Sequence, residues 1–119
     1  MNKIENGFKI KTNTLIIGDV TLQFEYPIQK VLELSGMLII LLEKPFKTIY
    51  NENVFGFSIE EGKIKWQIPK INYSTGLDCP FIDILFFESK LRLNNWCDIH
   101  LIVNPLTGEI LERSKPLKY

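Results

Sequence analysis

The sequence has no excess of charge of either sign. It carries 14 basic and 14 acidic residues, so its formal net charge at neutral pH is zero. Proteins that bind nucleic acid through its phosphates usually show a basic excess or a cluster of Lys and Arg. We therefore expect no nucleic-acid partner.

Long apolar runs are also missing. The longest, Met37 to Leu42, is far shorter than the roughly 20 residues that a membrane-spanning helix needs. The segment Met1 to Gly7 lacks the apolar stretch and the small-residue cleavage site of a secretory signal. These absences predict a cytoplasmic protein with no membrane contact.

Cysteine is scarce, with only Cys79 and Cys97 in the chain. Disulfides are concentrated in secreted proteins, and two cysteines without a secretory signal are more simply interpreted as reduced thiols. We therefore expect Cys79 and Cys97 to be unpaired.

Candidate catalytic residues are few. His100 is the only histidine and follows Asp98 by two positions, so on a strand both would point to one face, where a carboxylate-oriented histidine can act as a general base. A solvent-facing pair on the outside of a sheet is the more common case. Cys97 would point to the opposite face, which argues against a Cys-His dyad.

Metal and nucleotide sites have little support either. A zinc site needs three or four ligands, and the remaining Cys and Asp residues show no ligand spacing. No glycine-rich phosphate loop precedes a helix. We predict a protein that is not an enzyme, with no catalytic residue, no metal and no cofactor.

What the sequence does contain is a hairpin pattern that occurs twice, over Asn53–Trp66 and Asp98–Leu111. Each copy has an alternating apolar run, a turn with glycine and a second alternating run, which is typical of a β-hairpin. In the first copy, Trp66 shares a face with Ile64 and Ile68, which predicts one face on a core and one in water.

The whole chain reads as about ten antiparallel strands with no helix, and at this length residues 1–119 form a single all-β domain. Residues 28–68 and 82–113 each read as a four-stranded antiparallel meander with one apolar face. Packing these faces together gives a β-sandwich of two meander sheets. A partly open barrel has the same alternation and stays an alternative.

The hairpin over Val54–Trp66 resembles the outer half of a blade in quinoprotein-type β-propellers, where a strand leads through a glycine turn to a strand with tryptophan. The resemblance covers about two-thirds of the chain and implies blade-like sheets. Two blades do not close a ring, because propellers need at least about four. The cofactor chemistry of that family therefore does not transfer.

A second resemblance concerns the run Asn95-Trp96-Cys97-Asp98 and the ending Thr107–Arg113. In a small, neutral, all-β chain these segments resemble bacterial immunity proteins of polymorphic toxin and contact-dependent growth inhibition systems. The resemblance implies a cytoplasmic protein that neutralises a cognate toxin domain by stoichiometric binding and occlusion.

Candidate partner-binding residues are acidic side chains in turns and at strand ends, together with two aromatic side chains. If the turns lie together, the carboxylates form an anionic rim for a basic toxin cleft, and an exposed aromatic anchors the centre. For the tryptophan, the alternative role is to close the end of the sandwich. The residues are Glu60, Glu61, Tyr73, Asp78, Asp83, Glu88 and Trp96.

Three other functions stay open. A small ligand- or carbohydrate-binding β module would need exposed aromatic platforms. An enzyme would need His100 in a pocket. A self-associating structural protein would pair its exposed strand edges, for example as a homodimer.

Overall fold

The computed structural model describes residues 7–45, 49–70 and 79–114, and these residues form eleven strands and no helix. The predicted all-β class is confirmed. The strands are β1 (Phe8–Lys11), β2 (Thr14–Ile17), β3 (Val20–Gln23), β4 (Ile28–Leu34), β5 (Met37–Leu42), β6 (Val54–Ser58), β7 (Lys63–Gln67), β8 (Phe81–Phe87), β9 (Lys90–Asn95), β10 (His100–Val103) and β11 (Ile110–Arg113).

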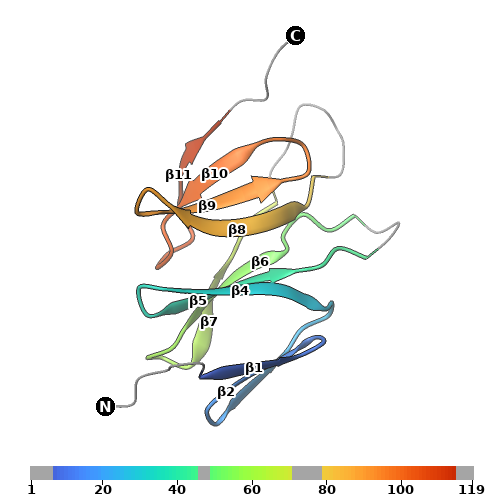
Figure 1. Cartoon of the computed structure of the whole chain (residues 1–119), viewed down its shortest axis with the longest axis vertical. Helices are drawn as coiled ribbons and strands as arrows, with labels where there is room; N and C mark the ends of the chain where they lie inside the picture. The colour runs from blue at the N-terminus through green and yellow to red at the C-terminus, as the bar shows by residue number, and fades with distance from the viewer. Residues whose placement is uncertain (1–6, 46–48, 71–78, 115–119) are drawn as a thin grey trace.

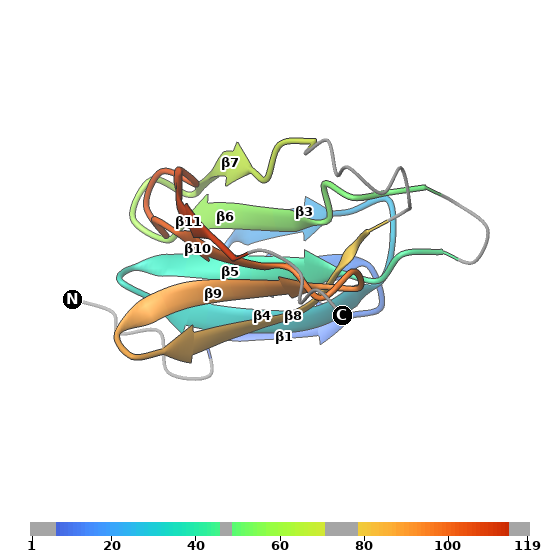
Figure 2. The same ribbon diagram turned by 90° about the horizontal axis from the view of Figure 1, so that it is seen from above.

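The strands form three open antiparallel sheets with the orders β1-β2-β3, β4-β5-β6-β7 and β8-β9-β10-β11. The two four-stranded meanders are those predicted at 28–68 and 82–113. The three sheets stack along the longest axis of the molecule, with β4–β7 in the middle (Figure 1). Seen from above, the long strands of the stacked sheets overlie one another (Figure 2).

The third sheet, β1–β3, is an addition to the two predicted sheets, and it covers the second face of the middle sheet. Every residue of β5 is buried. Met37, Ile39 and Leu41 pack toward β8–β11, whereas Leu38, Ile40 and Leu42 pack toward β1–β3. A strand buried on both faces is uniformly apolar, which explains why the longest apolar run of the chain occurs here.

The predicted common face of β7 holds for Trp66 and Ile68, which are buried, and fails for Ile64, which is 37% exposed. The register between β6 and β7 shifts between Gly56 and Phe57, so the two-residue alternation is interrupted at this point. A β-bulge of this kind redirects the side chains that precede it.

The expectation of reduced thiols is wrong, because Cys79 and Cys97 form a disulfide with their Cα atoms 5.4 Å apart. The bond joins the connection before β8 to the turn after β9. The redox conditions of a cell compartment determine how often disulfides persist. They do not determine which cysteines the fold brings close together.

The strand connections lie at two opposite ends of the stack. The antiparallel pairing places the turns after β4, β6, β8 and β10 at one end, which we call the turn end. The described residues of the β5–β6, β7–β8 and β9–β10 connections lie at the other end, which we call the loop end. A hydrogen bond of 3.1 Å from Ile59 N–H to Gly36 C=O joins two turns of the turn end.

Candidate functional site

The loop end presents the most exposed tryptophan of the described chain on a tightly held corner. Residues 95–99 reverse the chain between β9 and β10. The Asn95 side-chain Oδ1 accepts hydrogen bonds from the N–H groups of Cys97 and Ile99, at 3.0 and 2.9 Å. Asp98 has a left-handed backbone, with φ at 66°. This turn explains why β10 begins at His100 and not at Asp98, as the alternation suggested.

The corner is fixed to the neighbouring β7–β8 connection at two points. The Cys79–Cys97 disulfide joins the segments covalently, and Cys79 is fully buried in the core between the β4–β7 and β8–β11 sheets. The backbone N–H of Trp96 donates a 2.9 Å hydrogen bond to the carbonyl of Pro80. Trp96 is therefore carried by a segment with little freedom to move.

Trp96 borders an open hollow of about 610 Å³ and is itself 72% exposed. The lining is largely apolar and includes the polar side chains of Gln29, Glu43 and Lys44. Ile82, at 44% exposed, is the second large apolar side chain that solvent reaches here. The hollow is lined by Gln29, Glu43, Lys44, Pro80, Phe81, Ile82 and Trp96.

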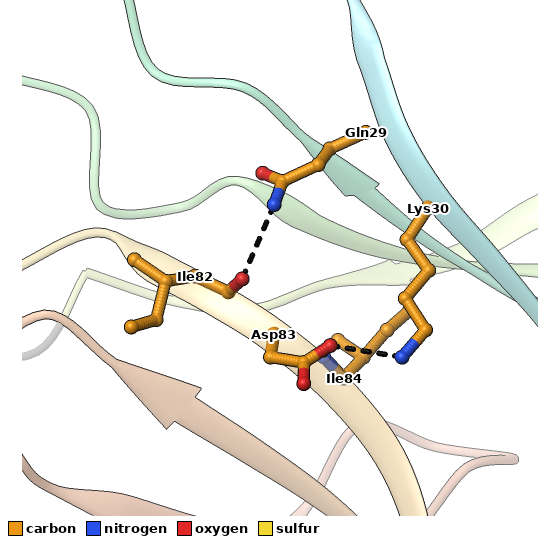
Figure 3. Close-up of polar contacts among 5 residues, drawn as sticks. All are labelled: Gln29, Lys30, Ile82, Asp83 and Ile84. Atoms are coloured by element: carbon orange, nitrogen blue, oxygen red, sulfur yellow. Dashed lines mark hydrogen bonds and ion pairs between the residues drawn. The ribbon is translucent and has the colours of Figure 1, made fainter.

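The edge strands β4 and β8 are joined by two polar contacts, which Figure 3 shows. Gln29 Nε2 donates to the Ile82 carbonyl at 3.3 Å, and Lys30 Nζ lies 2.9 Å from Asp83 Oδ1. Both members of the ion pair are about half exposed, so the pair contributes at most about 1 kcal/mol to stability. Its main effect is to align the two sheet edges.

The buried side chain of Asn53 is hydrogen-bonded to the backbone of Phe81, which lines the hollow. Its Nδ2 donates to the carbonyls of Leu42 and Phe81, both at 2.9 Å, and its Oδ1 accepts from the Phe81 N–H at 3.0 Å. One fully buried amide therefore connects β5 of the middle sheet with β8 of the outer sheet. No periodicity distinguishes this asparagine in the sequence.

The predicted anionic rim is divided between the two ends of the molecule. Glu60, Glu61 and Glu88 lie in turns of the turn end, whereas Asp83 and Trp96 lie toward the loop end. Tyr73 and Asp78 lie outside the described residues. The structure thus brings together three of the predicted acids at one end, and Trp96 with Asp83 near the other.

Two of these acids already have cationic partners. Asp83 pairs with Lys30, and Glu61 Oε1 lies 2.9 Å from Lys65 Nζ and 3.7 Å from Lys63 Nζ. The hydrogen bond from Lys65 holds the pKa of Glu61 below its usual value. Glu60 and Glu88 are therefore the carboxylates better placed to meet a cationic surface.

His100 contacts Arg92 and not Asp98. The Arg92 Nη2 atom hydrogen-bonds to His100 Nδ1 on the outer face of the β8–β11 sheet, while Asp98 lies in the preceding turn. Among the described residues, no group of three or more His, Cys, Asp or Glu side chains is arranged to hold a metal ion. The same residues contain no helix with the length and apolarity needed to cross a membrane.

Comparison with curated proteins gave no match, and comparison with solved structures gave none either. A family model does match, over residues 5–115, which is nearly the whole chain. The chain therefore belongs to the family described as a domain of unknown function, DUF7957.

Proposed function

We propose that this protein is a binding protein that covers a surface of a partner protein with its loop end. One observation carries the proposal: Trp96 is 72% exposed on a corner closed by a disulfide, beside an apolar hollow of about 610 Å³. The residues in contact with the partner are Trp96 and Ile82, the two large apolar side chains exposed at the hollow.

Exposing this apolar surface to water is unfavourable in free energy, and a bound partner would remove it from water. Large apolar patches rimmed by polar groups are characteristic of interaction sites, and tryptophan is the residue most enriched among those whose truncation weakens protein complexes. The Asn95 turn and the disulfide fix the backbone before binding. Little conformational entropy is then lost when the partner docks.

The partner class follows from the resemblance to immunity proteins and remains part of the proposal. In that case the partner is a toxin domain, and the protein acts by occluding it at a ratio of one to one. Glu43 in the lining of the hollow offers a carboxylate to a cationic group of the toxin, whereas Glu60 and Glu88 lie at the opposite end of the stack and are not part of this contact surface.

The test is affinity capture from the native host with three tagged proteins in parallel: wild type, Trp96→Ala and Phe86→Ala. Phe86 is the matched control, because it is an exposed aromatic of the same outer sheet near the turn end. We expect one stoichiometric partner for wild type and Phe86→Ala. With the purified partner, Trp96→Ala should bind about 30-fold more weakly, as expected for a loss of about 2 kcal/mol.

Equal affinity of wild type and Trp96→Ala would show that the loop end is not the contact surface. If no protein is captured and an oligosaccharide instead shifts the tryptophan fluorescence of the wild type, but not of Trp96→Ala, in a saturable way, the protein is a carbohydrate-binding module. A captured partner that is not a toxin would retain protein binding and remove the immunity role.

A further inference from the structure

The outer face of the β8–β11 sheet carries a second hollow, distinct from the Trp96 end. On β9 and β10, Leu93 and Leu101 point into the core, so the alternating residues Arg92 and His100 point outward. The hollow has a volume of about 270 Å³. Its charged and aromatic lining residues are Phe87, Glu88, Lys90, Arg92, His100, Glu112 and Arg113.

Arg92 is a half-buried cation without a carboxylate partner among the described residues. Its Nε donates to Asn94 Oδ1 at 3.0 Å, its Nη2 contacts His100, and its guanidinium lies 5.5 Å from the centre of the Phe87 ring. Of the two acids in the lining, Glu112 is paired with Lys90 at 3.3 Å, and no ion pair joins Glu88 to Arg92 among the described residues. A guanidinium has five N–H donors in a planar fork, and within the described chain those on Nη1 make no hydrogen bond.

The contact with Arg92 also determines which ring nitrogen of His100 accepts a hydrogen bond. A guanidinium only donates hydrogen bonds, so His100 Nδ1 accepts and the neutral ring carries its proton on Nε2. The ring therefore offers a further N–H donor beside the arginine. Packing against Phe87 and the hydrogen bond to Asn94 hold the guanidinium in place, so that it does not have to be ordered by a ligand.

We propose that this hollow binds a small oxyanion, a phosphate or a carboxylate group, between Arg92 and His100. The Arg92 fork supplies paired donors that match the geometry of both anions, and His100 Nε2–H supplies a third. Lys90 and Glu112 of the lining pair with each other, so Arg92 is the cation on which the recognition of an anion depends. The site does not depend on the proposed partner at the loop end.

The experiment uses the single histidine as a probe. Because His100 is the only histidine, its ring signals in an NMR spectrum are unambiguous. The full chain is titrated with sodium phosphate and, separately, with sodium acetate, at fixed pH and with ionic strength held constant by sodium chloride. We expect saturable shifts of the His100 ring and the Arg92 side-chain N–H signals with at least one anion. The anion whose titration gives saturable shifts shows whether the site binds a phosphate or a carboxylate group.

Three variants decide whether the shifts report this site. Arg92→Gln removes the cation and should weaken binding at least ten-fold, which is the size expected for a lost charge-assisted hydrogen bond. Arg92→Lys keeps the charge without the fork and should give an intermediate affinity. Lys9→Gln, which removes an exposed cation of β1, should bind as wild type does.

The proposal is overturned if neither anion gives a saturable shift. It is also overturned if Arg92→Gln responds as wild type does, because the shifts then reflect a general salt effect. If Arg92→Gln does not fold, Arg92→Lys decides: unchanged affinity in that variant contradicts the paired-donor geometry. Each of these results leaves the proposal for the loop end unaffected.

Discussion

The side chain of Asn53 hydrogen-bonds to both the N–H and the C=O of Phe81, at 3.0 and 2.9 Å. These two bonds span 28 residues of sequence and connect the middle sheet to the outer sheet. Buried backbone groups are almost always paired, and at this point the partner is a side chain in place of a strand. This one amide therefore contributes to the position of β8 and of the hollow beside Trp96, together with the contacts of Gln29 and Lys30.

Asn53→Ala should therefore lower the free energy of unfolding by about 3 kcal/mol, because buried groups of Phe81 and Leu42 lose their partner. Urea denaturation of wild type and variant measures the difference. The matched control is Asn104→Ala, which removes one exposed hydrogen bond to the N–H of Leu106 and should cost far less. Equal losses of unfolding free energy in the two variants would mean that the buried hydrogen bonds of Asn53 contribute no more to stability than the exposed hydrogen bond of Asn104.

The Cys79–Cys97 disulfide should contribute about 3 kcal/mol to stability, given its sequence separation of 18 residues. Reduction of the wild type should lower the urea midpoint by a corresponding amount. In the double variant Cys79→Ala, Cys97→Ser, the midpoint should already be low and should not respond to reductant. A wild-type midpoint that is insensitive to reductant would contradict the contribution of the bond.

The same bond bears on the cytoplasmic location, which stays a prediction. Disulfides persist in oxidising compartments and are usually reduced in the cytosol. Rapid alkylation of thiols in intact cells, followed by mass spectrometry, measures the state of Cys79 and Cys97 directly. Unlabelled cysteines in the native host would argue against a reducing location.

The strands were predictable because their signals are local. Alternation and two-residue turns such as Ser35–Gly36 need no information from distant residues, and the observed turn has positive φ at both positions, as short hairpins favour. The run Met37–Leu42 also contains a signal for the third layer, since an alternating strand has one apolar face and this one has two. The strands β1–β3 are among the roughly ten that the sequence predicts, but assigning one apolar face to each meander left them without a place as a third sheet.

The candidate sites were harder to predict because they depend on contacts between distant residues. The register of β9 and β10 pairs Asn94 with His100 and so brings Arg92 within reach of the histidine, whereas reasoning along one strand suggested Asp98 as its neighbour. Likewise, the division of the acidic residues between two ends follows from how the hairpins pair. Exposure of Trp96 was one of two alternatives, and the structure selects it.

Trp66 provides a test of packing between the two meanders. Its ring lies against Gly56 and Gly108, and its Nε1 donates a 2.8 Å hydrogen bond to the Pro105 carbonyl. A Cβ added at Gly108 would lie 2.7 Å from the ring, which is too close for any side chain. Gly108→Ala should therefore force Trp66 to move, at a cost of about 1–3 kcal/mol for the overlap alone.

Gly36→Ala is the matched control for this substitution. Gly36 and Gly108 have nearly the same backbone, with φ at 77° and 78°, but an added Cβ at Gly36 meets nothing within 4 Å. Both variants pay the same backbone strain, so the difference between their unfolding free energies isolates the contact with Trp66. If the two variants are equally destabilised, the tryptophan does not pack as described.

Tyr50 makes stability fall at high pH. Burial, followed by the nearby carboxylates of Glu25 and Glu52, raises the pKa of Tyr50 from its usual 10.0 to about 12. In the unfolded chain the phenol loses its proton at the lower pKa, so between pH 10 and about 12 the folded state binds more protons than the unfolded state. The contribution of Tyr50 is thus complete below pH 10 and is lost as the pH rises through its folded pKa.

Two measurements check this expectation. The ultraviolet absorbance of phenolate should show a component that titrates near pH 12 in the wild type and is missing in Tyr50→Phe. Urea unfolding at about pH 9 and about pH 11 should show a larger loss of stability in the wild type than in Tyr50→Phe, because only the wild type has this phenol to deprotonate. Other groups that titrate in this range, chiefly lysines, are common to both proteins and cancel in the comparison. Equal losses would show that the environment of Tyr50, including the Tyr26 ring whose centre lies 5.0 Å away, does not disfavour the phenolate.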